Sequence, residues 1–175
     1  MDELVLAVTT RECIALRGFS PRIELGMLES IQEETWFAQP AVIRNDPLAA
    51  EVRLVMLFQD ADHVLIDEHG RFAADQAVLP EAFIAGPGLP GLKRHVQGLA
   101  QARVDRSCSC ELAGYAFNPV DRPHSFFLVY RCRVVPAPGL STGAPVVSGS
   151  WVQSSALDRL IQIPHERWFI PVVAR

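Results

Sequence analysis

The chain has 175 residues, of which 49% are hydrophobic and 21% charged, with a formal net charge of −4. This composition predicts one folded domain and excludes a broad basic surface for nucleic acid. No apolar run approaches the roughly 18 residues that cross a bilayer, and the acidic residues Asp2 and Glu3 are unlike a signal peptide. We therefore expect a cytoplasmic protein without membrane contact.

The cysteines are few for a chain of this length, and reduced thiols are expected. They are Cys13, Cys108, Cys110 and Cys132. The CxC spacing at Cys108 lacks the CxxC pattern typical of zinc sites, so we predict no metal site. The alternative is a zinc site that Cys132 and either His95 or His124 would complete. The favoured interpretation is that the cysteines are small buried side chains.

The first fifty residues predict a strand, two helices and a turn. Leu4–Val8 is short and apolar, as in a strand. Thr9 or Thr10 would cap a helix over Arg11–Leu16. Pro21 would start a second helix, whose buried face would be formed by Ile23, Met27, Leu28 and Ile31. A loop and turn are then indicated by Pro40, Asn45, Asp46 and Pro47.

The next segment predicts a hairpin around a central strand. Glu51–Phe58 (EVRLVMLF) is almost continuously apolar, which is typical of a strand covered on both faces. The turn QDADH then leads to a second strand at Val64–Ile66. Acidic residues cluster around this turn and are expected on a solvated surface: Asp60, Asp62, Asp67 and Glu68. Arg71–Glu81 predicts an irregular connection.

A Gly/Pro-rich stretch precedes a helix and two strands. Apolar residues recur every three or four positions, as on an amphipathic helix: Leu92, Val96, Leu99, Ala100 and Val104. The helix ends near Ser107, and Glu111–Phe117 predicts a strand. In the long strand Ser125–Val135, alternation separates two faces. One face has Phe127, Val129, Arg131 and Arg133, and the other has Phe126, Leu128, Tyr130 and Cys132.

The last forty residues predict a loop followed by short elements. Pro136–Val147 has the Pro and Gly content of a surface loop. Gly149–Val152 predicts a short strand, and Ser154 or Ser155 would cap a helix running to Leu160. The segment HERWFIPVVAR is apolar enough to dock as a helix or tail, and Pro171 is expected to interrupt a helix there.

This succession of elements resembles the Nudix fold. HSFFLVYRCRV resembles the strand that follows the Nudix helix, GSWVQSSAL the Trp-Val step after it, and ERWFIPVV the terminal helix. VTTRECIALRGFS and the later Asp46-Pro47 turn resemble a bacterial Nudix-like group with an N-terminal extension. The resemblance implies a single α/β domain over residues 1–175, a Nudix-like α/β/α sandwich with a mixed sheet. Residues 1–50 would be its strand-helix extension and residues 51–175 its core.

The Nudix box, G-x5-E-x7-R-E-U-x-E-E-x-G-U, holds Mg²⁺ with glutamates on one helix face. Matching the helix by its apolar face puts Gly88 at the opening glycine and Arg94 at the first glutamate. The segment Ala102-Arg103-Val104 falls at R-E-U, and Arg106 and Ser107 fall at the metal-binding glutamates. The only carboxylates between Gly86 and Ala113 are Asp105 and Glu111. The resemblance therefore implies a degenerate box.

Arginine binds phosphate directly, so five arginines are the predicted ligand-binding residues. They are Arg94, Arg103, Arg106, Arg131 and Arg133. The alternative is a solvated helix face with Asp105 as a local partner. No catalytic residue is assigned, because neither His95 nor His124 has an orienting group at a defined spacing, and no nucleophile elbow is present. Trp36 and Phe37 precede a loop that could fold over a cleft, although core packing is the favoured role for them.

The resulting functional hypothesis is a non-catalytic Nudix-like module that needs no cofactor. It would bind a phosphorylated or nucleotide-like ligand, or a protein partner. The alternative is a divergent Nudix-type hydrolase, a phosphoesterase or pyrophosphatase acting on nucleoside diphosphate derivatives. That enzyme would use Mg²⁺ held by carboxylates outside the box. A third hypothesis is a structural role as a homodimer.

Overall fold

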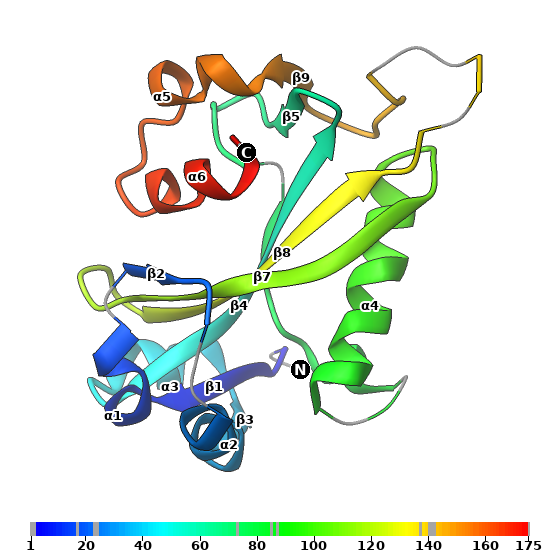
Figure 1. The fold of residues 1–175 in the computed structure, drawn as a ribbon. Helices are drawn as coiled ribbons and strands as arrows, with labels where there is room; N and C mark the ends of the chain where they lie inside the picture. The colour runs from blue at the N-terminus through cyan, green and yellow to red at the C-terminus, as the bar shows by residue number, and fades with distance from the viewer. Residues whose placement is uncertain are drawn as a thin grey trace. The chain divides into compact units, whose positions relative to one another are not determined.

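The structure is a computed structural model (Figure 1) that describes residues 3–16, 18–22, 25–72, 74–84, 86, 88–136, 138–139 and 143–174. The chain divides into two compact units. Unit 1 comprises Met1–Leu54, Gln76–Leu92 and Gly114–Val129. Unit 2 comprises Val55–Asp75, Lys93–Ala113 and Tyr130–Arg175.

Within the described ranges, nine strands form one sheet. The main path runs β2-β7-β8-β4-β1-β3, while β5 and β6 pair with β4 and β9 pairs with β5. Its three long strands, β4 (Ala49–Asp60), β7 (Cys108–Asn118) and β8 (His124–Val134), contribute residues to both units. The shorter strands are β1 (Val5–Thr9), β2 (Gly18–Ser20), β3 (Thr35–Ala38), β5 (His63–Ile66), β6 (Ala74–Ala77) and β9 (Ser150–Gln153).

In unit 1, β1 pairs antiparallel with β3 on one side and with the start of β4 on the other. Val8 lies opposite Thr35 in β3 and Ala50 in β4. The strand predicted at Leu4–Val8 is therefore confirmed. Buried residues of β1, α3 and β4 form a compact cluster, which consists of Val5, Ala7, Ile43 and Ala49.

The helices of unit 1 depart from the prediction in several places. The first is the short α1 (Thr10–Cys13) with a following 3-10 turn, and Thr9, at its N-cap, donates its hydroxyl to Glu34 instead of capping it. The second, α2 (Leu25–Glu33), begins after Pro21, and Ile23 lies outside the described residues.

The loop predicted around Pro40 is wrong, because Pro40–Asn45 forms a helix, α3. Pro40 occupies its first turn, where the missing N–H breaks no helical hydrogen bond. Ile43 anchors the helix in the core with 1% of its surface exposed. Proline here starts a helix, whereas the sequence pattern predicts a loop.

The prediction of β4 as a central strand is confirmed, because Leu54, Leu57 and Phe58 are fully buried. The hairpin is also confirmed: β4 pairs antiparallel with β5, and Asp60 lies opposite His63. A two-residue turn joins the strands, with Ala61 at a φ of 54°. β4 therefore extends two residues beyond the predicted end at Phe58, and Asp60 belongs to the strand.

The predicted amphipathic helix is α4 (Gly88–Arg103), in which Leu92, Val96 and Ala100 are buried. The segment expected to be an irregular connection contains the strand β6 and, at Pro80–Phe83, a 3-10 turn. In β8 the predicted alternation holds only at the end, where Cys132 and Val134 are buried and Arg133 is exposed, because Phe126–Tyr130 is buried on both faces.

The C-terminal segment forms two short helices, each preceded by a 3-10 turn: α5 (Leu157–Leu160) and α6 (Ile170–Val173), orange and red in Figure 1. The expectation that Pro171 interrupts a helix is wrong. Pro171 stands in the first turn of α6, where proline is tolerated. No helix of the described chain is long and apolar enough to span a membrane.

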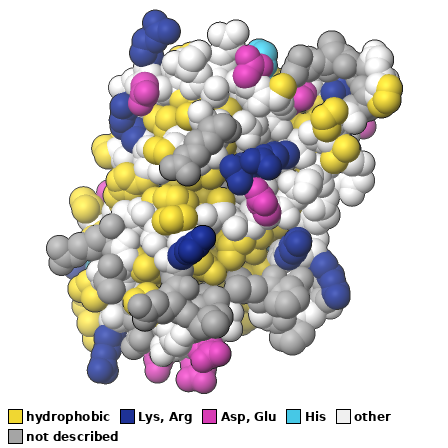
Figure 2. Space-filling view, viewed as in Figure 1, with side chains coloured by type: hydrophobic (Ala, Val, Ile, Leu, Met, Phe, Trp, Pro, Cys, Tyr) yellow, Lys and Arg dark blue, Asp and Glu magenta, His cyan; other side chains and the backbone are white. Residues whose placement is uncertain are grey.

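On the face shown in Figure 2, the described Lys and Arg side chains lie in separate spots, several of them beside Asp or Glu side chains.

Candidate functional site

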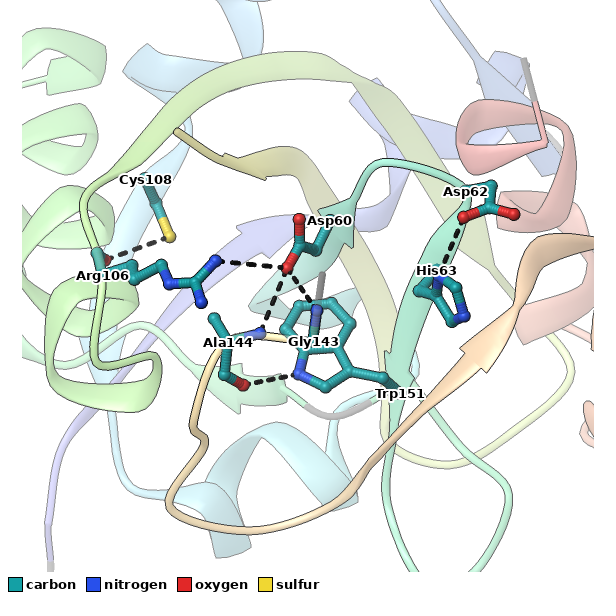
Figure 3. A network of polar contacts seen from close by, with 8 residues as sticks. All are labelled: Asp60, Asp62, His63, Arg106, Cys108, Gly143, Ala144 and Trp151. Atoms are coloured by element: carbon teal, nitrogen blue, oxygen red, sulfur yellow. Dashed lines mark hydrogen bonds and ion pairs between the residues drawn. The ribbon is translucent and has the colours of Figure 1, made fainter. Parts of the chain in front are cut away.

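The loop that leaves α4 contains an ion pair where the resemblance expects metal-binding glutamates (Figure 3). Arg106 Nη1 lies 3.9 Å from Asp60 Oδ2 at the end of β4. Both side chains are largely buried, with exposed fractions of 13% and 9%. The same Asp60 oxygen accepts hydrogen bonds from the backbone N–H groups of Gly143 (2.7 Å) and Ala144 (3.1 Å). The expectation that Asp60 lies on a solvated surface is therefore wrong.

Asp60 thereby holds part of the segment between β8 and β9 in place. Further backbone bonds tie this segment to the end of α4: Asp105 N–H donates to Pro145 O, and Val147 N–H donates to Arg103 O. Trp151 Nε1 donates to Ala144 O at 2.7 Å (Figure 3). We call this network the clasp. It surrounds the Asp60 carboxylate and consists of Asp60, Arg106, Gly143, Ala144 and Trp151.

Replacing Trp151 with phenylalanine tests the outer part of this clasp. We expect Trp151→Phe to lower the free energy of unfolding by about 1 kcal/mol, because the ring is kept while one hydrogen bond is lost. Urea denaturation followed by circular dichroism measures this change. Trp168→Phe is the matched control, and equal losses in both variants would contradict the role of the Ala144 bond.

The two predicted strand arginines share one carboxylate. Arg131 Nε donates to Glu111 Oε1 at 2.9 Å, and its Nη1 donates to Val172 O at 3.2 Å. Arg133 Nη1 lies 3.9 Å from the same Glu111 oxygen, which is an ion pair beyond hydrogen-bond distance. Arg131 is thus anchored at two points, whereas Arg133 is 52% exposed and held by a long pair.

Arg133 lines an open pocket of about 440 Å³ in unit 2. We call it the polar pocket, and its other lining residues are Gln59, Ala61, Ser109, Val134, Val135 and Pro136. Gln59 is 9% exposed and donates its amide nitrogen to Val173 O. Because a carbonyl accepts from nitrogen only, this bond sets the amide orientation. Gln59 Oε1 is left buried and without a partner among the described residues.

The remaining predicted arginines do not line this pocket. Arg94 is exposed on α4. Arg103, at the end of α4, has a buried Nε without a partner in the described part of the chain. Arg106 forms the ion pair with Asp60. The structure therefore brings Arg131 and Arg133 together at Glu111, and Arg106 to Asp60.

All four cysteines are buried, as predicted. The Cys110 thiol donates to Cys132 Sγ at 3.2 Å. Burial raises the pKa of Cys108 to about 11, with smaller contributions from Cys110 and Asp60. Such a thiol is a poor nucleophile at neutral pH, which favours a structural role. Among the described residues, no group of three or more His, Cys, Asp or Glu is placed to hold a metal ion.

Sequence reasoning missed Gln59 and the role of Asp60. One local signal was available, because a Gln-Asp pair ends an apolar strand and alternation sends the two side chains to opposite faces. Their partners carry no such signal: Gly143 and Val173 lie 83 and 114 residues further along the chain.

Comparison with solved structures identifies the architecture. The structure of Tm1382, a Nudix hydrolase candidate, superposes with a TM-score of 0.74 at 14% sequence identity, covering 98% of each chain. This chain has a Nudix-like fold. A NUDIX hydrolase from Nitrosomonas europaea aligns with a TM-score of 0.40 at 15% identity, over 70% of this chain and 86% of that one. No protein-family model and no curated protein matches the sequence.

The Nudix-like α/β/α fold predicted from the sequence is therefore confirmed. The helix α4 has no carboxylate between Gly88 and Arg103. Mg²⁺ needs several hard oxygen ligands, but the loop after α4 has a guanidinium beside Asp60, one of whose oxygens already accepts two amides. The residues at this position do not fit a Mg²⁺ ion.

Proposed function

We propose that this chain is a non-catalytic Nudix-like module that binds a phosphorylated or nucleotide-like ligand in the polar pocket of unit 2. The observation that carries the proposal is the exposed guanidinium of Arg133 on a pocket that the polar residues Gln59 and Ser109 also line. Arginine is the side chain best suited to bind phosphate directly, so its place on an open pocket favours an anionic ligand.

Arg133 provides the anion contact. Its guanidinium is half exposed, and its ion pair with Glu111 within the described residues is long, at 3.9 Å, so it can turn to a phosphate with little loss. Arginine binds phosphate through two parallel N–H donors. Val134 and Val135 offer apolar surface to the rest of the ligand in the same pocket. Arg131 acts by holding Glu111 in place.

The clasp supports the non-catalytic part of the proposal. Where a Nudix hydrolase would place metal-binding glutamates, Arg106 neutralises Asp60 directly. Asp60 Oδ2 already accepts two backbone amides. Activating a water molecule would require a carboxylate that is not committed in this way. The proposed role therefore needs recognition of phosphate but no cofactor.

Isothermal titration calorimetry with adenosine 5′-monophosphate and ribose 5-phosphate tests the pocket. We expect both to bind, adenosine without phosphate to bind much more weakly, and Arg133→Gln to weaken binding at least about tenfold, as for loss of a charge-assisted contact. Arg44→Gln is the matched control, because it removes one positive charge from α3 of unit 1 and should leave affinity unchanged.

Two results would overturn the proposal in different ways. If Arg94→Gln weakens binding and Arg133→Gln does not, the ligand binds at the arginines of α4 and the polar pocket is the wrong site. If the protein releases phosphate from nucleoside diphosphate derivatives in a Mg²⁺-dependent reaction, the hydrolase alternative is correct.

Glu111→Gln is expected to change phosphate affinity in the opposite direction from Arg133→Gln. Because Glu111 competes with the ligand for Arg133, neutralising it is expected to raise phosphate affinity about two- to fivefold, the range of an exposed ion pair. The free energy of unfolding should change by less than about 1 kcal/mol, because the pairs are partly exposed. Calorimetry and urea denaturation measure the two effects, and lower affinity in Glu111→Gln would contradict competition.

A further inference from the structure

Unit 1 contains an apolar chamber of about 290 Å³. Side chains of β1, α2, β4, α4 and β8 form its wall, including Leu6, Ile31, Val52, Leu92, Phe126 and Leu128. Each of these six is buried, with at most 6% of its surface exposed. The chamber is therefore a hollow within the core of unit 1, and Thr35 of β3 and Phe83 of the 3-10 turn at Pro80–Phe83 also line it.

The chamber has an aromatic mouth. A second hollow, of about 360 Å³, shares Leu6, Thr35, Phe83 and Gly88 with it and is also lined by Trp36 and Phe37. Trp36 and Phe37 are 37% and 38% exposed. Phe37 packs edge-on against Phe83, with ring centroids 6.0 Å apart and an angle of 78°. The two hollows share four lining residues and therefore adjoin, and the partly exposed Trp36 and Phe37 line the outer one.

The lining excludes charged ligands. No Asp, Glu, Lys or Arg is among the described residues that line either hollow. The Thr35 hydroxyl already donates to Gln32 O at 2.8 Å, which leaves the Gln32 side-chain amide as the main polar group of the wall. An ion would lose its hydration here without a counter-charge, whereas a neutral apolar group would gain by burial.

Volume and shape favour a ring. Dry apolar cavities of about 150 Å³ in proteins bind benzene, and this chamber is larger. Partly exposed Trp and Phe side chains present the faces and edges on which aromatic rings stack. A ring in the chamber could extend past Trp36 and Phe37, with one polar edge directed to Gln32.

We propose that this chamber is a second binding site, specific for a neutral, flat aromatic molecule of one or two rings. This second site goes beyond the proposed function, because the chamber lies in unit 1 and no residue of the polar pocket lines it. Either site can be correct without the other.

Indole is the probe for this site, and hexanol is the aliphatic comparator. In methyl NMR spectra of the full chain, indole titrated into the millimolar range should shift Leu6, Ile31, Val52, Leu92 and Leu128 along one saturable curve. Hexanol should bind at least fivefold more weakly. Leu128→Phe, which fills the chamber, should weaken indole binding at least tenfold while the spectrum remains that of a folded protein.

Trp36→Ala is the second variant, for the case that Leu128→Phe does not fold. Because Trp36 is partly exposed, its removal should leave the fold intact. We expect about fivefold weaker indole binding, as for one lost aromatic contact. Leu48→Ala, at a 66% exposed apolar residue outside both hollows, should leave binding unchanged. The proposal is overturned if indole shifts none of these methyl groups, if hexanol binds equally well, or if filling the chamber or removing Trp36 leaves affinity intact.

Discussion

Asp60→Ala is expected to lower the free energy of unfolding by about 2–4 kcal/mol, because it removes a buried carboxylate that accepts two backbone hydrogen bonds and forms an ion pair. The N–H groups of Gly143 and Ala144 lose their bonds at 2.7 and 3.1 Å. Arg106, whose side chain is 13% exposed, loses its ion pair with Asp60. The segment between β8 and β9 is then held only by its backbone bonds to the end of α4 and by Trp151.

Urea denaturation measures this loss, and two further variants define its origin. Asp60→Asn keeps a carbonyl acceptor without the charge, so it should retain part of the stability. Asp62→Ala is the matched control, because Asp62 lies two residues away in the turn and its side chain is 68% exposed. This substitution should change the free energy of unfolding by no more than about 0.5 kcal/mol. Equal losses for Asp60→Ala and Asp62→Ala would show that the clasp does not stabilise the fold.

The second large effect concerns Glu166, a carboxylate with 5% of its side chain exposed. It accepts hydrogen bonds from the Phe72 backbone N–H at 2.9 Å and from Arg71 Nε at 3.2 Å. Burial raises the pKa of Glu166 above its ordinary value of 4.5, although the bonds from Phe72 and Arg71 and the charges of Arg71 and His165 oppose the shift. The carboxylate thus joins the segment after β5 to the turn that precedes α6.

Glu166→Ala is expected to lower the free energy of unfolding by about 1–3 kcal/mol, because the buried Phe72 N–H loses its acceptor. Glu166→Gln keeps a carbonyl for Phe72, and Arg71, whose side chain is 41% exposed, can turn to water. The glutamine variant should therefore be much more stable than the alanine variant. Similar losses in both would contradict the role of the Phe72 bond.

The same residue predicts a pH dependence. Since the folded-state pKa of Glu166 is raised, the folded chain binds more protons than the unfolded chain between 4.5 and that raised value. The stability that protonation provides is present below pH 4.5 and is lost as pH rises through the folded pKa. Unfolding free energies of the native chain and Glu166→Gln between pH 4 and pH 7 measure this. As pH rises, the native chain should lose stability relative to Glu166→Gln. A constant difference between the two unfolding free energies would exclude a raised pKa of Glu166.

Several elements could be predicted from local pattern alone. The apolar run EVRLVMLF predicts a strand covered on both faces, and Leu54, Leu57 and Phe58 are fully buried. The spacing of Leu92, Val96 and Ala100 predicts the buried face of α4. These predictions succeed because side-chain direction repeats every 2 residues in a strand and about every 3.6 in a helix. The absence of carboxylates on α4 is likewise a property of the sequence.

Prediction from local pattern failed at residues whose local sequence is compatible with two different structures. The pattern around Pro40 predicts a loop, but proline is also favoured in the first turn of a helix, and Pro40 stands there in α3. The acidic residues around Asp60 predict a solvated turn that follows the strand. Its burial follows from the partners that it meets, and acidic composition alone does not distinguish the two environments.

The order of the main strands and helices, and the absence of carboxylates from α4, follow from the amino-acid sequence. The pairing of each arginine with its carboxylate, and the bond from the Gln59 amide to Val173 O, depend on tertiary packing. The physical reason is that burial periodicity is set by neighbouring residues, whereas a polar side chain is satisfied by partners that folding brings from distant parts of the chain. For Asp60 and Gln59 those partners lie 83 and 114 residues away.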